Sequence, residues 1–163
     1  LNMPAGVAVD ENGDVYVADF RNDRVQRFSA DGEFRMSFGS SGSGDGELNR
    51  PMGVSVDPDG DVYVCDWANN RVQIFDLEGN FLDQWTHLGT PYALFLTEDD
   101  RLFVADGVNA KVWIADANDG TLLGTIEGTE GIHWVAVDPS GNVYAASNRS
   151  HYLRKYSKVG ATN

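Results

Sequence analysis

An internal repeat is the feature that most constrains what this chain can fold into. Four segments align without gaps: "VAVDENGDVYVAD" (7–19), "VSVDPDGDVYVCD" (54–66), "LFLTEDDRLFVAD" (94–106) and "VAVDPSGNVYAAS" (135–147). Their starts lie 47, 40 and 41 residues apart. A unit that recurs at such an interval is a supersecondary block that buries its apolar faces against its neighbours. We therefore expect residues 1–163 to form one domain, or one part of a larger array.

Each unit predicts four short strands. Two runs of β-branched, aromatic or small residues, such as 7–9 and 15–18, flank a turn rich in Asp, Asn and Gly, which is typical of a hairpin. Alternating segments that predict a third strand lie at 24–28, 71–75, 111–115 and 152–156. After another glycine-bearing turn, a fourth strand is expected at 33–38, 80–85 and 121–126. No segment has helical periodicity. The sequence therefore predicts an all-β fold, a β-propeller of four-stranded antiparallel blades.

The expected blades span roughly 4–38, 51–86, 91–126 and 132–163. In the last unit Gly160 aligns with the turn glycines Gly32, Gly79 and Gly120, and the sequence ends three residues later. The fourth blade is therefore expected to lack its last strand. An unpaired edge at 152–156 would recruit another strand or chain. We accordingly expect either a part of a longer propeller or, if 163 residues is the natural length, a homo-oligomer.

The repeat resembles a known family. A proline, two residues, Val-x-Val-Asp, a turn glycine, Val-Tyr-Val-x-Asp and then Asn-x-Arg-Val-Gln-x-Phe make a pattern similar to the NHL repeat, at 4–28 and 51–75, and more loosely at 91–115 and 135–156. This resemblance implies a β-propeller. NHL propellers serve as binding platforms for protein or RNA, as extracellular sensor domains, and as the scaffold of the peptidyl-hydroxyglycine amidating lyase, and the fold does not decide among these roles.

Charge narrows the choice of partner. Twelve basic residues stand against 25 acidic ones, a formal net charge of −13. Such a chain repels phosphate backbones and anionic membrane surfaces at long range. No apolar run approaches the ~18 residues that cross a bilayer. We therefore expect a soluble acidic chain with neither nucleic acid nor a membrane as its partner.

Charged residues also recur inside the repeat. Three units end the second strand with an aspartate and place a basic residue five positions later: Asp19 with Arg24, Asp66 with Arg71, and Asp106 with Lys111. The fourth unit replaces both members together, with Ser147 and Tyr152. This joint change favours a structural ion pair that ties the second strand to the third.

Positions that differ between blades are the candidates for binding. One aligned position holds Ala5, Met52, Tyr92 and His133, and another holds Phe20, Trp67, Gly107 and Asn148. Framework positions repeat because every blade needs them, whereas variable loop positions are free to specialise. The predicted ligand-binding residues on this loop face are Phe20, Arg21, Trp67, Tyr92, His133, Trp134 and Arg149. Large aromatic side chains there could equally form a chain–chain interface or cover a blade edge.

The sequence contains no nucleophile–base pair and no repeated set of metal ligands. We therefore expect a non-catalytic scaffold, without a cofactor, that binds a protein, peptide or small ligand. The alternative is a metal-dependent propeller enzyme resembling the amidating lyase or lactonase-type hydrolases. It depends on His133, because the lyase resemblance places zinc-binding histidines at the mouth of the channel. A catalytic zinc needs about three protein ligands, but the equivalent positions hold Ala5, Met52 and Tyr92. Trp134 stands where the lyase pattern has an acidic calcium ligand.

Overall fold

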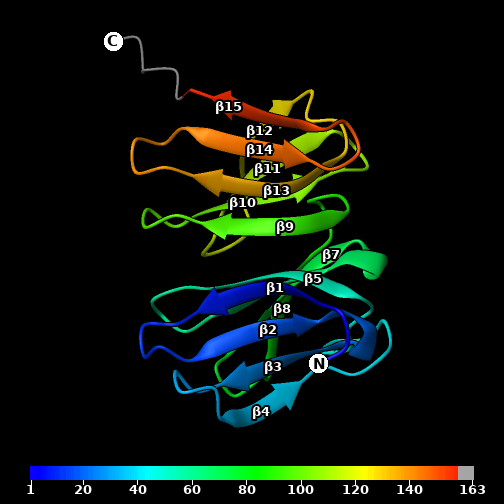
Figure 1. The fold of residues 1–163 in the computed structure, drawn as a ribbon, viewed down its shortest axis with the longest axis vertical. Coiled ribbons are helices and arrows are strands. Elements are labelled where there is room, and N and C mark those ends of the chain that lie inside the picture. Colours follow the sequence, from blue (N-terminus) through cyan, green and yellow to red (C-terminus); the bar gives the residue numbers. More distant parts are fainter. Residues whose placement is uncertain (158–163) are drawn as a thin grey trace.

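The computed structural model describes residues 1–157, which form four antiparallel sheets (Figure 1). Blade one contains β1 (Pro4–Val9), β2 (Val15–Asp19), β3 (Arg24–Phe28) and β4 (Phe34–Phe38). Blade two contains β5 (Pro51–Val56), β6 (Val62–Asp66), β7 (Arg71–Phe75) and β8 (Phe81–Trp85). Blade three contains β9 (Pro91–Leu96), β10 (Arg101–Asp106), β11 (Lys111–Asp116) and β12 (Leu122–Glu127). Blade four contains β13 (Ile132–Val137), β14 (Val143–Ser147) and β15 (Tyr152–Tyr156).

These sheets are the blades of a β-propeller, as the repeat predicts. Within each sheet the strands follow chain order, so that every blade is a meander. The first strands of the blades lie side by side, β1 against β5, β5 against β9 and β9 against β13 (Figure 1). The fourth blade has three strands among the described residues, in agreement with the expected missing strand. The aligned turn at Gly160 lies outside those residues.

The strand boundaries differ from the prediction mainly at the first strand. It begins at Pro4, Pro51 and Pro91 in the first three blades, three residues before the expected start. Proline is tolerated at the first position of a strand, where its missing N–H removes no interior ladder bond. Two 3₁₀ turns, η1 (Phe20–Asn22) and η2 (Trp67–Asn69), follow the second strand. Three residues are too few to show a helical period in the sequence.

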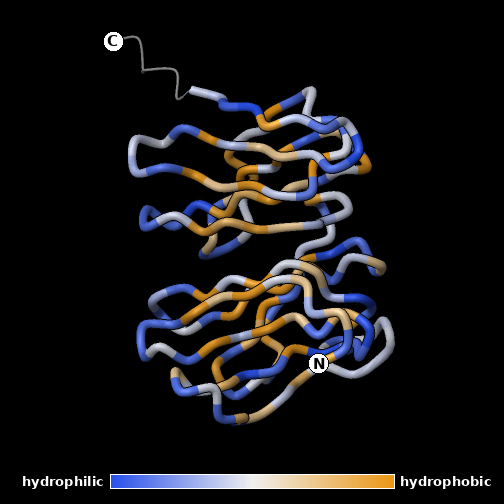
Figure 2. Tube along the Cα trace, viewed as in Figure 1, coloured by the Kyte–Doolittle hydropathy of each residue, from blue (hydrophilic) through white to orange (hydrophobic). Residues whose placement is uncertain are grey.

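The core consists of three apolar layers, one between each pair of successive blades. We call the side of a blade that faces the preceding blade its front face, and the opposite side its rear face. Tyr16, Val25 and Phe38 on the rear face of blade one pack with Val54 and Phe75 on the front face of blade two. Equivalent residues fill the other two layers. Figure 2 shows the corresponding pattern, with hydrophobic residues along the strands and hydrophilic ones at many of the turns.

Glycine permits close approach between blades at the third turn of the repeat. A Cβ atom at Gly79 would lie 2.5 Å from Cβ of Phe38, and one at Gly120 would lie 2.6 Å from the Trp85 ring. Both glycines also have positive φ, +78° and +73°, which L side chains rarely adopt. The last aromatic residue of one blade is thus covered by the turn of the next.

Candidate functional site

The loop that follows the second strand is anchored by a buried aspartate. Asp66 is fully buried and accepts four hydrogen bonds, from the amide of Asn49 at 2.7 Å, Asn69 Nδ2 at 2.9 Å, Arg71 Nε at 2.7 Å and Gln73 Nε2 at 3.0 Å. The predicted ion pair with Arg71 is therefore present. The Asn49 bond also ties the connection between blades one and two to this loop. The carboxylate thus holds together the blade connection and the loop after the second strand, which are parts of the loop face.

Asp19 plays the same part in blade one. Burial would raise the pKa of this carboxyl, but hydrogen bonds outweigh it and lower the pKa from 3.8 to about 2. The donors are the amide of Asn2 and the side chains of Asn22, Arg24 and Gln26. Arg24, the expected ion-pair partner, places Nε 3.0 Å from the carboxylate.

This shift predicts an acid-sensitive contribution to stability. Because the pKa of Asp19 is lower in the folded chain, its contribution is fully present above pH 3.8 and is lost as the pH falls toward about 2. We expect Asp19→Asn to flatten the fall in unfolding free energy across that range, measured by urea unfolding at a series of pH values. The exposed control Asp31→Asn should leave the slope as in the parent. Equal slopes for parent and Asp19→Asn would contradict the assignment.

The third predicted ion pair is wrong. Lys111 Nζ lies 3.2 Å from Glu127 Oε1, its register neighbour on β12. Asp106 instead accepts hydrogen bonds from Asn109 and, at 3.0 Å, from Trp113 Nε1. Lysine has no Nε–H of the kind that bonds the aspartate in blades one and two. Trp113 stands where those blades have glutamine and donates in place of that glutamine.

Four of the predicted binding residues form one continuous row across the blades. The ring centroids of Phe20 and Trp67 are 6.3 Å apart, those of Trp67 and Tyr92 are 5.7 Å apart, and those of Tyr92 and His133 are 4.7 Å apart. Each ring comes from a different blade, in chain order. We call these four residues the aromatic row. The indole Nε1 of Trp67 is buried and has no hydrogen-bond partner among the described residues.

The row changes its structural origin at blade three, where Gly107 makes room for Tyr92. Phe20 and Trp67 begin the 3₁₀ turns, whereas Tyr92 and His133 are second residues of β9 and β13. At the position equivalent to Phe20 and Trp67, blade three has Gly107, where a Cβ atom would lie 2.3 Å from the carbonyl oxygen of Ile132 and 3.4 Å from the Tyr92 ring. The missing side chain thus lets one strand residue replace a loop residue in the row.

The two predicted arginines lie near opposite ends of the aromatic row. Arg21 lines an open polar cleft of about 600 Å³ beside Phe20. At the other end, Cβ of Arg149 lies 3.0 Å from where a Cβ would stand on Gly131, whose carbonyl accepts a 2.8 Å hydrogen bond from His133 Nδ1. The sequence analysis missed four polar residues of the cleft: Asn2, Asp23, Asn49 and Arg50. Asn2, Asn49 and Arg50 precede the first strands, in segments that differ in length between blades, so the repeat alignment gave no signal for them. Asp23 lies in the loop between the second and third strands, which has the same length in every blade, and its variable position, aligned with Asn70, Ala110 and His151, was an available signal.

Trp134 does not join the row. It lies on β13 opposite Ala146, on the rear face of blade four, and is 58% exposed. A register shift between Ile132 and Trp134 separates it from its neighbour His133. Residues adjacent in a strand point to opposite sides. His133 therefore belongs to the loop face, whereas Trp134 belongs to the rear face of blade four.

His133 is the residue on which a metal site would depend. Its Nδ1–H donates to the Gly131 carbonyl, which leaves Nε2 as the atom that could coordinate a metal. Within residues 1–157, no group of three or more His, Cys, Asp and Glu side chains is arranged to hold a metal ion. The ring contact with Tyr92 instead places His133 at the end of the aromatic row.

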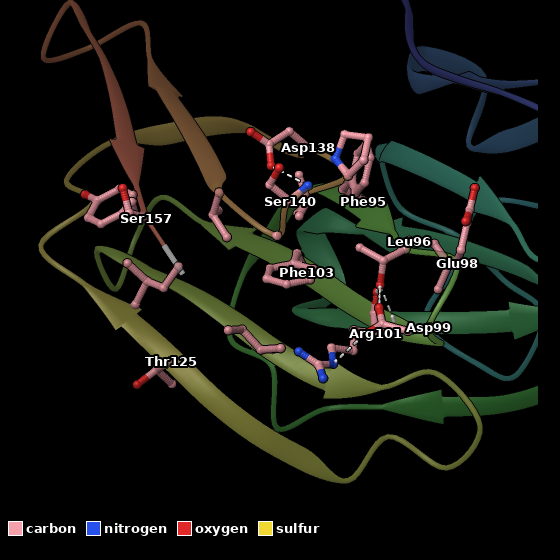
Figure 3. Close-up of a pocket in the computed structure, with 18 residues that line it drawn as sticks. Phe95, Leu96, Glu98, Asp99, Arg101, Phe103, Thr125, Asp138, Ser140 and Ser157 are labelled. Carbon is pink, nitrogen blue, oxygen red and sulfur yellow. Dashed lines mark hydrogen bonds and ion pairs between the residues drawn. The ribbon is translucent and has the colours of Figure 1, made fainter. Parts of the chain in front are cut away.

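Another cleft lies between blades three and four, beside their first hairpin turns (Figure 3). It measures about 850 Å³, with Phe103 at its floor and Glu98, Asp99, Arg101 and Asp138 around it. Ile126 lines it where the earlier blades carry Phe38 and Trp85. The smaller side chain at this repeat position was the feature of the sequence that could have predicted the cleft. Ser157, the last described residue, borders the cleft.

Comparisons with known proteins agree with this fold. The family model described as NHL repeat matches residues 1–28 and 48–75. Protein brain tumor of Drosophila melanogaster is 44% identical over 45 residues, 28% of this chain and 4% of that protein. Among solved structures, hydrazine synthase of Kuenenia stuttgartiensis matches with a TM-score of 0.79 at 15% identity, and a nidogen/laminin complex with 0.78 at 22%.

The matches to solved structures cover nearly all of this chain but only part of each matched chain. The chain is covered over 96% and 94% by the two solved structures, and spans 46% and 59% of their chains. A protein of unknown function from Bacteroides caccae is similar, with a TM-score of 0.68 at 15% identity, 98% of this chain and 58% of that one. At such identities the structures establish the fold alone. None of the helices in residues 1–157 has the length and apolar character needed to span a bilayer.

Proposed function

We propose that this chain, a β-propeller whose residues 1–28 and 48–75 match the NHL repeat, is a scaffold that binds a protein or peptide on its loop face. The observation that carries the proposal is the aromatic row. It joins four blades through ring contacts of 4.7–6.3 Å, although its members occupy positions where the repeat pattern does not require aromatic residues. Aromatic side chains are enriched at the energetic centres of protein interfaces.

The members of the row differ in how much of their ring surface they expose to a partner. Tyr92 is buried, at 9% exposure, so it supports its neighbours more than it presents surface. Phe20, Trp67 and His133 are half-buried and keep part of their rings accessible. A ligand would therefore contact rings already held in place by their neighbours, which reduces the entropy lost on binding.

The polar cleft beside Phe20 suggests the chemistry of the partner. Arg21 and Arg50 lie there with Asp23, and the Asp23 carboxylate already accepts a 2.8 Å hydrogen bond from the Arg50 amide. Two guanidinium groups and one carboxylate leave a local excess of positive charge on a chain whose net charge is −13. Guanidinium groups bind carboxylates in bidentate geometry. We therefore infer a peptide segment with apolar residues for the row and an acidic residue for the cleft.

The nidogen/laminin structure offers a parallel at the level of fold, since a chain of that protein complex has a similar fold. The matched chain is 22% identical to this one, which carries no residue assignments. It supports the proposal only as a similar fold that occurs in a complex between proteins.

Peptide display tests the proposed site directly. A library of displayed peptides is panned against the immobilised chain, and recovered peptides are synthesised and titrated. We expect Trp67→Ala to weaken binding at least tenfold, the loss typical of a central interface aromatic. Arg21→Ala should weaken acidic peptides selectively. The control Leu82→Ala removes an apolar side chain that is 49% exposed on β8, the edge strand of blade two, and that belongs to neither the aromatic row nor the cleft.

The result that would overturn the proposal is equally concrete. The proposal fails if recovered peptides bind Trp67→Ala, Phe20→Ala and Arg21→Ala as tightly as the parent while all three variants keep the parent's melting temperature. Binding would then take place away from the aromatic row. A screen that recovers no peptide above background would also contradict the proposal.

A further inference from the structure

The front face of blade one is bare, although its counterparts are the core of the molecule. Val7 is 66% exposed, whereas the residues at the same position of the later blades, Val54, Leu94 and Val135, are 5%, 9% and 8% exposed. Val9 and Phe34 of the same face are 60% and 58% exposed. In every later blade the rear face of the preceding blade covers this position. The front face of blade one is therefore equivalent to the faces that the rear face of a preceding blade covers elsewhere in the chain.

The rear face of blade four is bare in the corresponding way. Leu153 is 73% exposed, whereas Val25, Val72 and Val112 at the same position are fully buried. Trp134 adds a second large apolar side chain to this face, at 58% exposure. Beside it, β15 pairs with β14 and with no other strand among residues 1–157. Blade four thus ends in a bare face and a bare edge.

A polar contact accompanies each of the first two junctions. Arg27 of blade one lies over the Tyr16 ring, 5.3 Å from its centroid, and donates to the Leu77 carbonyl of blade two at 3.1 Å. In the second junction the Tyr63 hydroxyl donates to the Ala117 carbonyl at 2.9 Å. Leu77 and Ala117 occupy the same turn position of the repeat. In both junctions, a polar side chain of one blade therefore donates a hydrogen bond to the same turn carbonyl of the following blade.

Blade four has the same cation and ring on its rear face. Lys155 and Tyr144 stand at the positions of Arg27 and Tyr16, and Lys155 Nζ lies 5.4 Å from the centroid of the Tyr144 ring, whose hydroxyl donates to Asp138 at 3.0 Å. The acceptor position in blade one is Ala30, which is exposed and followed by the acidic residues Asp31 and Glu33. The charge of Lys155 thus complements the turn that a docked first blade would bring to it.

We propose that a second copy of this chain docks head to tail, the front face of its blade one covering the rear face of blade four. The contact continues the three junctions inside the chain, all of which join a rear face to a front face. Lys155 donates to the Ala30 carbonyl of the second copy, as Arg27 does to the Leu77 carbonyl in the first junction. Such an interface is heterologous, so it builds a closed ring or an open series rather than a two-fold dimer. It goes beyond the proposed ligand site, because the aromatic row belongs to neither face.

Light scattering on the purified 163-residue chain across a dilution series tests the proposal. We expect masses above the single-chain value of 17.8 kDa that fall toward it on dilution. Val7→Asp should block the front face and Leu153→Asp the rear face, and each variant alone should have the single-chain mass. Leu123→Asp is the matched control, because Leu123 is 51% exposed at the irregular end of β12 and lies on neither face. It should assemble as the parent does.

Mixing the two blocked variants is the decisive measurement. Each retains one intact face, so an equimolar mixture should form a species of twice the single-chain mass that grows no further. Val9→Asp and Trp134→Glu serve as a second pair if either first variant loses the parent's circular dichroism spectrum. A parent chain that stays at 17.8 kDa throughout, or a mixture that stays there, would overturn the proposal, the first pointing to a further blade as the natural occupant.

Discussion

Replacing Asp66 by alanine should lower the free energy of unfolding by about 3–5 kcal/mol, the cost of removing one member of a buried ion pair. Arg71, its partner, is 6% exposed and would remain buried without a carboxylate. The substitution also removes the acceptor of bonds from Asn49, Asn69 and Gln73. Chemical denaturation monitored by tryptophan fluorescence measures the change.

Two other carboxylates provide a graded control for Asp66. Asp19→Ala should cost less than Asp66→Ala, because the side chain of Arg24 is 37% exposed and water can solvate the cation left behind. Asp99→Ala removes half of a pair whose side chains are 44% and 60% exposed, so its effect should stay below about 1 kcal/mol. A loss of peptide binding in Asp66→Ala without any loss of stability would refute the structural role.

Phe75→Ala should also cost about 3–5 kcal/mol, the range for truncating a buried phenylalanine. Phe75 is fully buried on the front face of blade two, with ring centroids 4.9 Å from Phe38 and 6.3 Å from Phe81. Truncation would remove these contacts and leave a cavity between two blades. Urea unfolding of parent and variant at one protein concentration gives the difference.

Phe28 is the natural control for Phe75, because it holds the same repeat position on the front face of blade one. It is half-buried and has its ring 6.0 Å from Phe34. Phe28→Ala should therefore cost less than half as much as Phe75→Ala. The comparison is best made in the Leu153→Asp background, in which no second copy covers the face. Equal costs in that background would show that the face is covered within a single chain, contrary to the structure.

The blades themselves were predictable because their signals are local. The third strands at 24–28, 71–75 and 152–156 have the expected boundaries, since alternation and turn glycines act between neighbouring residues. The prediction of Asp–Arg pairs in blades one and two was also correct, because five residues across a strand connection place both side chains on adjacent strands. Lys111 failed this rule because its partner depended on what β12 placed beside it.

The candidate site could be predicted only in part. Variation between blades identified Phe20, Trp67, Tyr92 and His133, but two alignment columns gave no sign that these residues form a single row. That row exists because Gly107 lets Tyr92 occupy the space of a loop residue. The side on which Trp134 lies was equally undetermined, since a register shift in β13 separates it from His133.

By itself, then, the sequence determined the repeat, the four-stranded meander, the turn positions and the residues free to vary. Only the tertiary structure decided which variable residues meet, which faces are covered and which remain bare. The physical reason is the range of the interactions. Strand periodicity and turn conformation depend on residues a few positions apart, whereas contacts between blades join residues about 40 positions apart through the packing of whole faces. Val7 and Val54 are identical in type and repeat position, yet one is 66% exposed and the other 5%, because blade one packs over Val54 and no described blade packs over Val7.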